Sequence, residues 1–236
     1  MGGPATSVVV LPSVLVGASA YTGLAEAFRG LGLVAAVAAP PLEVRRGADV
    51  LETFRASVAR ARPDLVVAHS NAGLVAPAAA AGVPVVFVDA ALPPPTGPGR
   101  MAPAALMARL EELADASGML PPWTGWWDAE DVPPLFPDVA TRRVVEADQP
   151  RLPLDYFRSE VASPPGWEGG AHAYLAFGGT YAGELGRARR LGWPTAVVDG
   201  ARHLHHLHHP EPVARSVLAL AAAATSSDDA GPHGPV

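Results

Sequence analysis

Short runs of β-branched residues alternate along this chain with alanine-rich stretches in which apolar residues recur at helical spacing. Such alternation is typical of βαβ units and predicts a parallel sheet with helices on its faces. The run DLVVA at 64–68 has no polar residue in its interior, which is typical of a central, covered strand. The predicted strands are 7–11, 33–38, 64–68, 83–88, 173–177 and 195–198, and the predicted helices are 22–32, 48–61, 71–81, 182–191 and 212–224.

The pattern weakens in the middle of the chain. Residues 93–170 hold most of the prolines and four of the five tryptophans, and only 101–117 suggests one or two helices. An irregular insertion of this kind beside a sheet commonly serves as a lid or a substrate-facing cap. We therefore predict one α/β domain over 1–224 with a lid insertion at 93–170, followed by a disordered tail at 225–236.

Composition narrows the class of protein. The 236 residues are 49% hydrophobic, which is enough for one sizeable core. A net charge of −6 gives no indication of a nucleic-acid partner or an anionic membrane surface. The absence of cysteine excludes disulfides, cysteine-ligated zinc and a cysteine nucleophile. All 17 basic residues are arginine, which, with the high alanine, glycine and proline content, is typical of a high-GC bacterial genome.

The amino-terminal segment is apolar, but its first basic residue is Arg29, whereas a secretory signal needs a basic segment before its apolar core. No stretch of about 18 apolar residues is free of proline or glycine clusters, so we expect no membrane span. The sequence thus favours a cytoplasmic monomer or homodimer whose partner is a small-molecule substrate.

One segment carries a candidate nucleophile. In DLVVAHSNAG a buried strand runs into Ser70 and then directly into a helix, with the small residues Ala68 and Ala72 two places to either side. A sharp strand-to-helix turn that exposes a serine hydroxyl tolerates only small residues there. The backbone N–H of Asn71 would then point at a developing oxyanion. The alternative, a serine that merely caps a helix, is disfavoured by the strand that precedes it.

Four blocks together resemble the α/β-hydrolase superfamily, particularly small bacterial members whose turn reads His-Ser-Asn-Ala-Gly. They are VVVLPSVLVG, AHSNAG, VVFVDA and GARHLHHLHHPEPVA, and their spacing extends over nearly the whole chain. The resemblance implies the α/β-hydrolase fold, with a mostly parallel central sheet flanked by helices. It also implies an enzyme that needs no cofactor.

The resemblance also indicates the general base. Members place the catalytic histidine after a glycine-containing turn, shortly before a Pro-Glu pair that opens the last helix, and His203 fits this position. An unperturbed pKa near 6.5 suits an imidazole to proton transfer around neutrality. A zinc site is the rival interpretation, although no carboxylate lies at a suggestive spacing. Its ligands would come from the other histidines of the run, such as His205, His206 and His209.

The acid departs from the usual pattern. Most members carry it after the strand that corresponds to 173–177, but here Gly178, Gly179 and Thr180 follow that strand and no carboxylate appears before Glu184. Some members, haloalkane dehalogenases among them, take the acid from the strand after the nucleophile helix, where this chain has Asp89. Asp89 could orient the imidazole or only bind loop amides. Glu184, or a serine–histidine pair without an acid, remain the alternatives.

The oxyanion loop and the pocket complete the predicted site. In the loop 12–17, where relatives often have His-Gly, the N–H of Val14 is the expected second oxyanion donor, with Leu15 close behind and the Ser13 hydroxyl as a further candidate. At least two lid aromatics should line an apolar pocket, and the others should pack the lid onto the sheet. The candidates are Trp123, Trp126, Trp127, Trp167, Tyr156 and Phe157.

These features predict a serine hydrolase that acts on an ester or thioester of a small, fairly hydrophobic substrate. The missing acid after strand 173–177 would also suit a cyclase, epimerase or lyase of a bacterial natural-product pathway built on the same fold. A catalytically silent binding protein is the third possibility. Covalent labelling of Ser70 distinguishes the first from the other two.

Overall fold

A six-stranded, wholly parallel sheet forms the centre of the computed structural model, which describes residues 5–228. Its order is β2-β1-β3-β4-β7-β8, so β3 and β4 lie in the middle and are buried at every residue. The predicted mostly parallel sheet is confirmed. The strands are β1 (Ser7–Leu11), β2 (Val34–Val37), β3 (Leu65–Ser70), β4 (Val85–Ala90), β7 (His172–Phe177) and β8 (Thr195–Val198).

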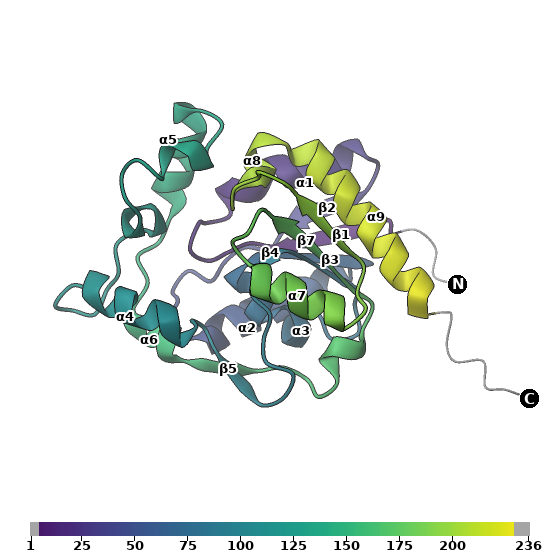
Figure 1. Ribbon diagram of the computed structural model, residues 1–236, viewed down its shortest axis with the longest axis horizontal. Coiled ribbons are helices and arrows are strands. Elements are labelled where there is room, and N and C mark those ends of the chain that lie inside the picture. The colour runs from purple at the N-terminus through teal and green to yellow at the C-terminus, as the bar shows by residue number, and fades with distance from the viewer. Residues whose placement is uncertain (1–4, 229–236) are drawn as a thin grey trace, which may run out of the picture.

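Helices cover both faces of this sheet. Helix α1 packs against α9 above the sheet in Figure 1, and α2 packs against α3 below it, on the same side as α7. Right-handed βαβ connections produce this layering. No helix within residues 5–228 is long and apolar enough to cross a bilayer. The helices are α1 (Thr22–Gly30), α2 (Gly47–Ala61), α3 (Ala76–Ala79), α7 (Ala182–Arg190), α8 (His205–His208) and α9 (Pro210–Asp228).

Two predicted helices differ from what the structure contains. The stretch 71–81 is not one α-helix but a 3₁₀ turn, η2 (Asn71–Leu74), followed by the single turn of α3. Pro77 stands in the first turn of α3, and a proline there prevents a continuous helix because it lacks an N–H and clashes with the preceding turn. Helix α9 extends four residues into the expected tail, and residues 229–236 of that tail lie outside the described residues.

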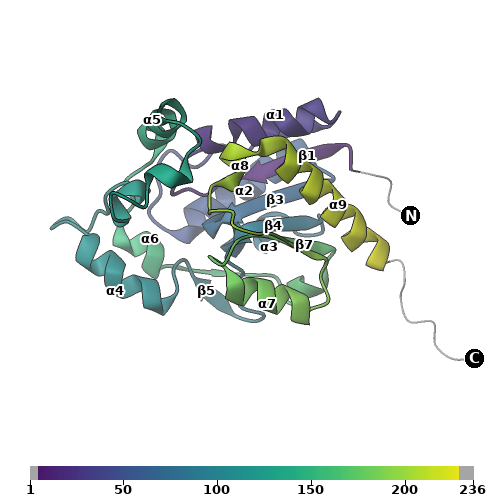
Figure 2. The same ribbon diagram turned by 45° about the horizontal axis from the view of Figure 1, so that its top comes forward.

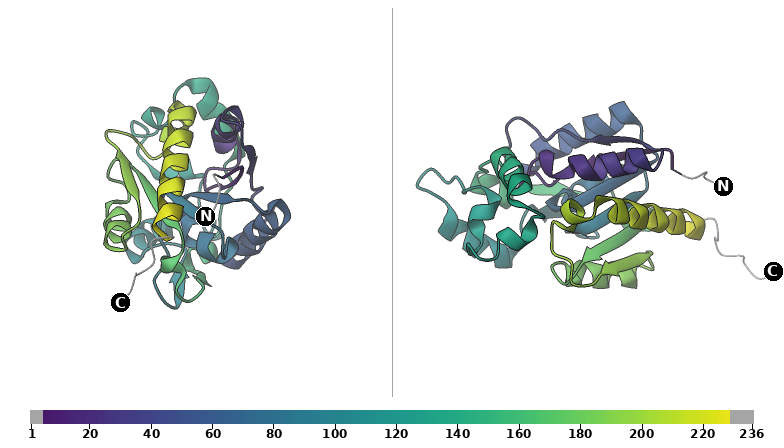
Figure 3. Two further views of the ribbon diagram at one scale, coloured as in Figure 1. Left: turned by 90° about the vertical axis from the view of Figure 1, so that its right-hand side faces the viewer. Right: turned by 90° about the horizontal axis from the view of Figure 1, so that it is seen from above.

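The segment between β4 and β7 forms a separate layer at the carboxyl ends of the strands, drawn in teal in Figures 1 and 2. In the right-hand view of Figure 3 this layer lies to one side of the sheet. A two-stranded antiparallel ribbon lies at its base. Helix α4 falls inside the predicted 101–117 region, whereas the other elements were not predicted. The elements are β5 (Pro98–Arg100), α4 (Ala104–Leu113), η3 (Trp123–Trp126), η4 (Pro133–Leu135), α5 (Val139–Asp148), α6 (Leu154–Arg158), β6 (Glu160–Ala162) and η5 (Trp167–Gly169).

Candidate active site

The chain reverses sharply where β3 meets η2. Ser70 adopts φ 58° and ψ −131°, a backbone conformation that side-chain-bearing residues rarely hold and that costs about 1–3 kcal/mol. The turn also needs Gly73, since a Cβ there would overlap the carbonyl oxygen of Ala91. The surrounding residues Ala68 and Ala72 are small and buried. The local sequence therefore holds the Ser70 hydroxyl at the carboxyl edge of the sheet.

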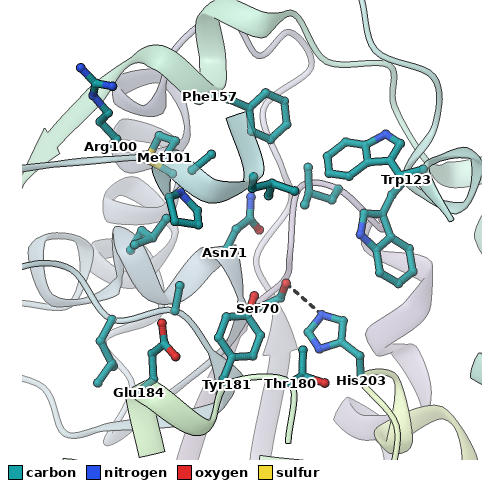
Figure 4. A pocket seen from close by; sticks show the side chains of 18 of the residues that line it. Ser70, Asn71, Arg100, Met101, Trp123, Phe157, Thr180, Tyr181, Glu184 and His203 are labelled. Carbon is teal, nitrogen blue, oxygen red and sulfur yellow. Dashed lines mark hydrogen bonds between the residues drawn. The ribbon is translucent and has the colours of Figure 1, made fainter. Parts of the chain in front are cut away.

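Three predicted residues meet at this edge. The Ser70 hydroxyl donates to Nε2 of His203 at 3.0 Å, and Nδ1–H of His203 donates to Oδ2 of Asp89 at 2.7 Å. Figure 4 shows the imidazole facing Ser70 across the floor of a cavity. Both separations are hydrogen-bond lengths, so the serine proton has a direct path to the imidazole.

Asp89 is completely buried at the end of β4, with φ 41°. Its second oxygen, Oδ1, accepts a hydrogen bond from the backbone N–H of Phe177 at 3.1 Å. The Asp89 side chain therefore fits both interpretations from the sequence, because it binds a backbone amide, at the end of β7, and also faces the imidazole. Glu184 starts α7 and lines the cavity, and within residues 5–228 it makes no contact with His203.

The histidine run divides between the site and the core. His203 follows β8 through a turn in which Gly200 has φ 69°. His206 is buried against Tyr21, with ring centroids 4.9 Å apart, whereas His205 and His209 keep part of their surface in solvent. Burial lowers the pKa of His206 to about 3. In the part of the chain that the structure describes, no three His, Cys, Asp or Glu side chains are grouped to hold a metal ion, so the rival zinc site is not formed.

Two backbone N–H groups are free to receive an oxyanion. Within residues 5–228, neither Asn71 nor Val14 donates its backbone N–H to another protein atom. The other two candidate donors in this loop already have acceptors. The Ser13 hydroxyl donates to Oδ1 of Asn71 at 2.8 Å, and the backbone N–H of Leu15 donates to the side-chain oxygen of Ser13 at 3.3 Å. Val14 lines a second cavity and not the one that contains Ser70.

A cavity of about 930 Å³ opens above Ser70 and His203. It lies between the sheet and the inserted segment 91–171, which we call the cap. Its walls are mostly apolar and include four of the six candidate aromatics. Pockets of this size and character hold small organic ligands. The lining residues that matter below are Ser70, His203, Trp123, Trp126, Trp127, Phe157, Tyr181 and Arg202.

The prediction that Tyr156 lines this pocket is wrong. Its ring packs edge-on against Phe157 at 4.8 Å and is fully buried, and its hydroxyl accepts a hydrogen bond from Nδ2 of Asn71 at 2.7 Å. A phenol whose hydroxyl has a buried partner turns inward, so Phe157 takes the wall position instead. Trp167 also lies away from the cavity. Its indole N–H donates to the carbonyl of Pro94 at 3.0 Å within the same inserted segment, and its ring packs against Phe87 of β4 with centroids 6.1 Å apart.

Sequence reasoning missed Tyr181. This residue follows the Gly-Gly-Thr turn after β7, and its hydroxyl points toward Ser70 from beside the imidazole. Burial raises the pKa of Tyr181 to about 12, so the phenol stays protonated at neutral pH and can donate. The available signal was its position after a strand end, where the expected carboxylate was missing.

Comparison with protein-family models and with curated proteins finds no match to the sequence. Solved structures do match, at TM-scores of 0.64 and 0.68 for the first two below and 0.59 for the third. An extracellular α/β-hydrolase from a Paenibacillus species is 17% identical, over 90% of this chain and 97% of its own. Tomato methylketone synthase I, in complex with 2-tridecanone, is 14% identical, over 92% and 98%. The thioesterase domain from the curacin biosynthetic pathway is 11% identical, over 93% of each chain.

These likenesses extend over nearly the whole chain at low sequence identity. They confirm the α/β-hydrolase fold that the four sequence blocks indicated. Because one fold carries many chemistries, the reaction has to be argued from the residues around Ser70.

Proposed function

We propose that this protein is a serine hydrolase that cleaves an ester or thioester of a small, fairly hydrophobic substrate. The observation that carries the proposal is the line of hydrogen bonds from Ser70 through His203 to Asp89, at 3.0 and 2.7 Å, on the floor of an apolar cavity. A serine hydroxyl becomes a useful nucleophile when a base in hydrogen-bond reach takes its proton and a third group orients that base.

In the proposed reaction, His203 takes the hydroxyl proton as the Ser70 oxygen attacks the substrate carbonyl carbon. The backbone N–H groups of Asn71 and Val14 donate to the oxyanion that develops, and preorganised donors of this kind lower the barrier most effectively in a water-poor site. His203 then returns the proton to the leaving alcohol or thiol. Water, activated by the same imidazole, attacks the acyl-enzyme and releases the acid, which restores Ser70.

The cavity supports the proposed substrate class. Its walls carry Trp123, Trp126, Trp127 and Phe157, which favour an acyl or alcohol group with apolar surface. Arg202, which directly precedes His203 in the chain, lines the cavity as an exposed cation and could bind a polar substituent of the substrate. The volume of about 930 Å³ sets an upper bound on the part of the substrate that the cavity encloses.

Labelling with a fluorophosphonate probe tests the proposal directly. The native protein should gain one covalent adduct, and mass spectrometry of the digested protein should locate it on the peptide that contains Ser70. The heat-unfolded protein and the Ser70→Ala variant serve as controls and should stay unlabelled, because the activated hydroxyl exists only in the folded site. A native protein that binds apolar esters but never labels or turns them over would be a binding protein.

The His203→Ala variant should lose hydrolysis by about 10⁴- to 10⁶-fold in kcat, because it removes the base that is hydrogen-bonded to the Ser70 hydroxyl. His209→Ala is the matched control, since this histidine comes from the same run and is exposed, and it should retain turnover. Rates are measured with a short-chain aryl ester. Inactivation by a chelator with recovery on adding zinc would instead replace the proposed triad by a metal site.

A second candidate is a non-hydrolytic enzyme of the same fold, and Tyr181 is the observation that favours it. A protonated phenol and an imidazole on the same cavity floor can donate and accept protons on a bound substrate without an acyl-enzyme. The two candidates separate in one comparison. A non-hydrolytic enzyme loses conversion in His203→Ala and Tyr181→Phe but keeps it in Ser70→Ala, whereas the hydrolase loses it in Ser70→Ala.

A further inference from the structure

We propose that the buried His69 is a positioning residue that holds the backbone of His203 and the oxyanion loop in one hydrogen-bonded line. The inference rests on the proposed hydrolytic site and assigns it a support that lies outside the triad. His69 directly precedes the nucleophile on β3, is 1% exposed, and stacks on the His203 ring with centroids 4.6 Å apart. It does not line the cavity.

The hydrogen-bond partners of His69 fix its tautomer. Nε2 lies 2.9 Å from the backbone oxygen of His203, which can only accept, so the ring proton is on Nε2. Nδ1 of the neutral ring therefore accepts, and the Tyr21 hydroxyl donates to it at 2.8 Å. The same Tyr21 oxygen accepts the backbone N–H of Ser13 at 2.9 Å. Every donor and acceptor direction between the base loop and the oxyanion loop is thus determined.

The ring is neutral because of where it lies. Burial, together with the neighbouring imidazoles of His203 and His206, holds the pKa of His69 well below its usual value. The groups packed around it are those two histidines, the Tyr21 phenol and the apolar ring of Phe177. No carboxylate is among these ring neighbours, and burial outweighs the bond to the His203 carbonyl, which by itself favours the charged form.

The line continues past Ser13 into the cap. The Ser13 hydroxyl donates to Oδ1 of Asn71 at 2.8 Å, and Nδ2 of Asn71 donates to the Tyr156 hydroxyl on α6 at 2.7 Å. All the side chains in this line are buried, so a broken link leaves a donor or acceptor that water cannot reach. The line thereby passes through Asn71, whose N–H is one proposed oxyanion donor. It also passes through Ser13, which directly precedes Val14, the other proposed donor.

Such a line has a clear use in the proposed reaction. Ser70 and Asp89 fix the ring of His203, but its backbone lies in the turn between β8 and α8 and needs a separate anchor. A displacement of about 1 Å at a catalytic group can cost about 100-fold in rate. By holding the His203 carbonyl directly and the Ser13 amide through the Tyr21 hydroxyl, His69 keeps the base and an oxyanion donor at a fixed separation.

Two isosteric variants separate the two ends of His69. In His69→Asn the amide reaches the place of Nδ1 and keeps the bond to Tyr21, but it cannot reach the His203 carbonyl. In His69→Gln the amide nitrogen reaches the place of Nε2 and keeps the bond to His203, but loses Tyr21. We expect His69→Asn to lower kcat about 10- to 100-fold with KM little changed, and His69→Gln to lose clearly less.

Rates are compared per folded molecule, and a second measurement does not depend on turnover. The proton between Nδ1 of His203 and Asp89 should give a low-field NMR resonance in the wild type and in His69→Gln, and it should broaden or vanish in His69→Asn. If the Asn variant folds poorly, Tyr21→Phe takes its place. This variant removes one oxygen from the line and should also lower kcat. His206→Leu is the packing control: it touches the same rings outside the line, so it should lower the melting temperature and leave kcat unchanged.

Each outcome decides the matter. Wild-type kcat and an intact low-field resonance in His69→Asn would overturn the positioning role, as would equal losses in the Asn, Gln and His206→Leu variants, which indicate packing alone. If the wild type neither labels at Ser70 nor hydrolyses esters, the proposed function fails by itself, and the resonance comparison still tests the anchoring of His203.

Discussion

Replacing Ser70 with alanine is expected to reduce hydrolysis of a short-chain aryl ester by about 10⁴- to 10⁶-fold in kcat. Within residues 5–228, the Ser70 hydroxyl is the nucleophile that is hydrogen-bonded to the imidazole of His203, so its loss ends the acyl-enzyme route and leaves the donors of Asn71 and Val14 to assist water. The measurement is steady-state turnover with enough enzyme to detect a residual rate. Wild-type turnover in the variant would contradict the hydrolase proposal.

The same variant should keep its fold, since alanine retains the Cβ that the turn already accommodates. Thermal unfolding provides the check, with Ser70→Gly as the informative companion. Ser70 has φ 58°, which glycine adopts without steric cost. The glycine variant should therefore be inactive and at least as stable as the alanine variant, whereas a large loss of stability in both would show that the serine hydroxyl supports the turn itself.

Asp89→Asn is expected to lower kcat by up to about 10⁴-fold, because the amide favours the imidazole tautomer that carries its proton on Nε2 and cannot accept one from Ser70. The new side chain can still accept the N–H of Phe177 through its oxygen, so the end of β4 should stay in place. KM should change little, since Asp89 is completely buried and does not line the cavity. Steady-state kinetics with an aryl ester separates the two parameters.

Glu184→Gln is the matched control for this substitution, because Glu184 lines the cavity and has no contact with the imidazole. Its effect should be modest and fall on KM. If Asp89→Asn left kcat unchanged and Glu184→Gln lowered it strongly, Glu184 on α7 would be the acid. If neither variant slows a protein that still labels at Ser70, the site works as a serine–histidine pair.

Hydrophobic pattern was enough to predict the sheet. Strands such as VVVL and VVFVD lie between alanine-rich helices, and because parallel strands are buried on both faces their sequences are nearly unbroken apolar runs. The predicted helix over 71–81 failed for a local reason, the proline in the first turn of α3. The cap elements failed because short helices such as α6, with five residues, carry too little periodicity to detect.

Candidate site residues were found only where a motif or strand end marked them. Ser70 stands out by its small neighbours, and Asp89 by the strand that it ends. Tyr181 was missed although it follows a strand end, because a phenol is not the carboxylate expected there. His69 was missed although it lies in the AHSNAG motif, because its partner, the backbone of His203, is 134 residues away along the chain. Contacts of that kind are set by tertiary packing, which a single sequence does not show.

The place of Asp89 on β4 has a consequence for how this fold can change. Nucleophile and acid both leave the sheet from its two central strands, so the loop after β7 is freed from supplying a carboxylate. Gly178 must stay, since a Cβ there would lie 2.7 Å from the carbonyl oxygen of Ala201. Residues 179 and 180 are open to diversification, which makes them the natural target of a mutagenesis library, whereas Tyr181 faces Ser70. Substrate preference can evolve in this short segment while the proton relay is inherited unaltered.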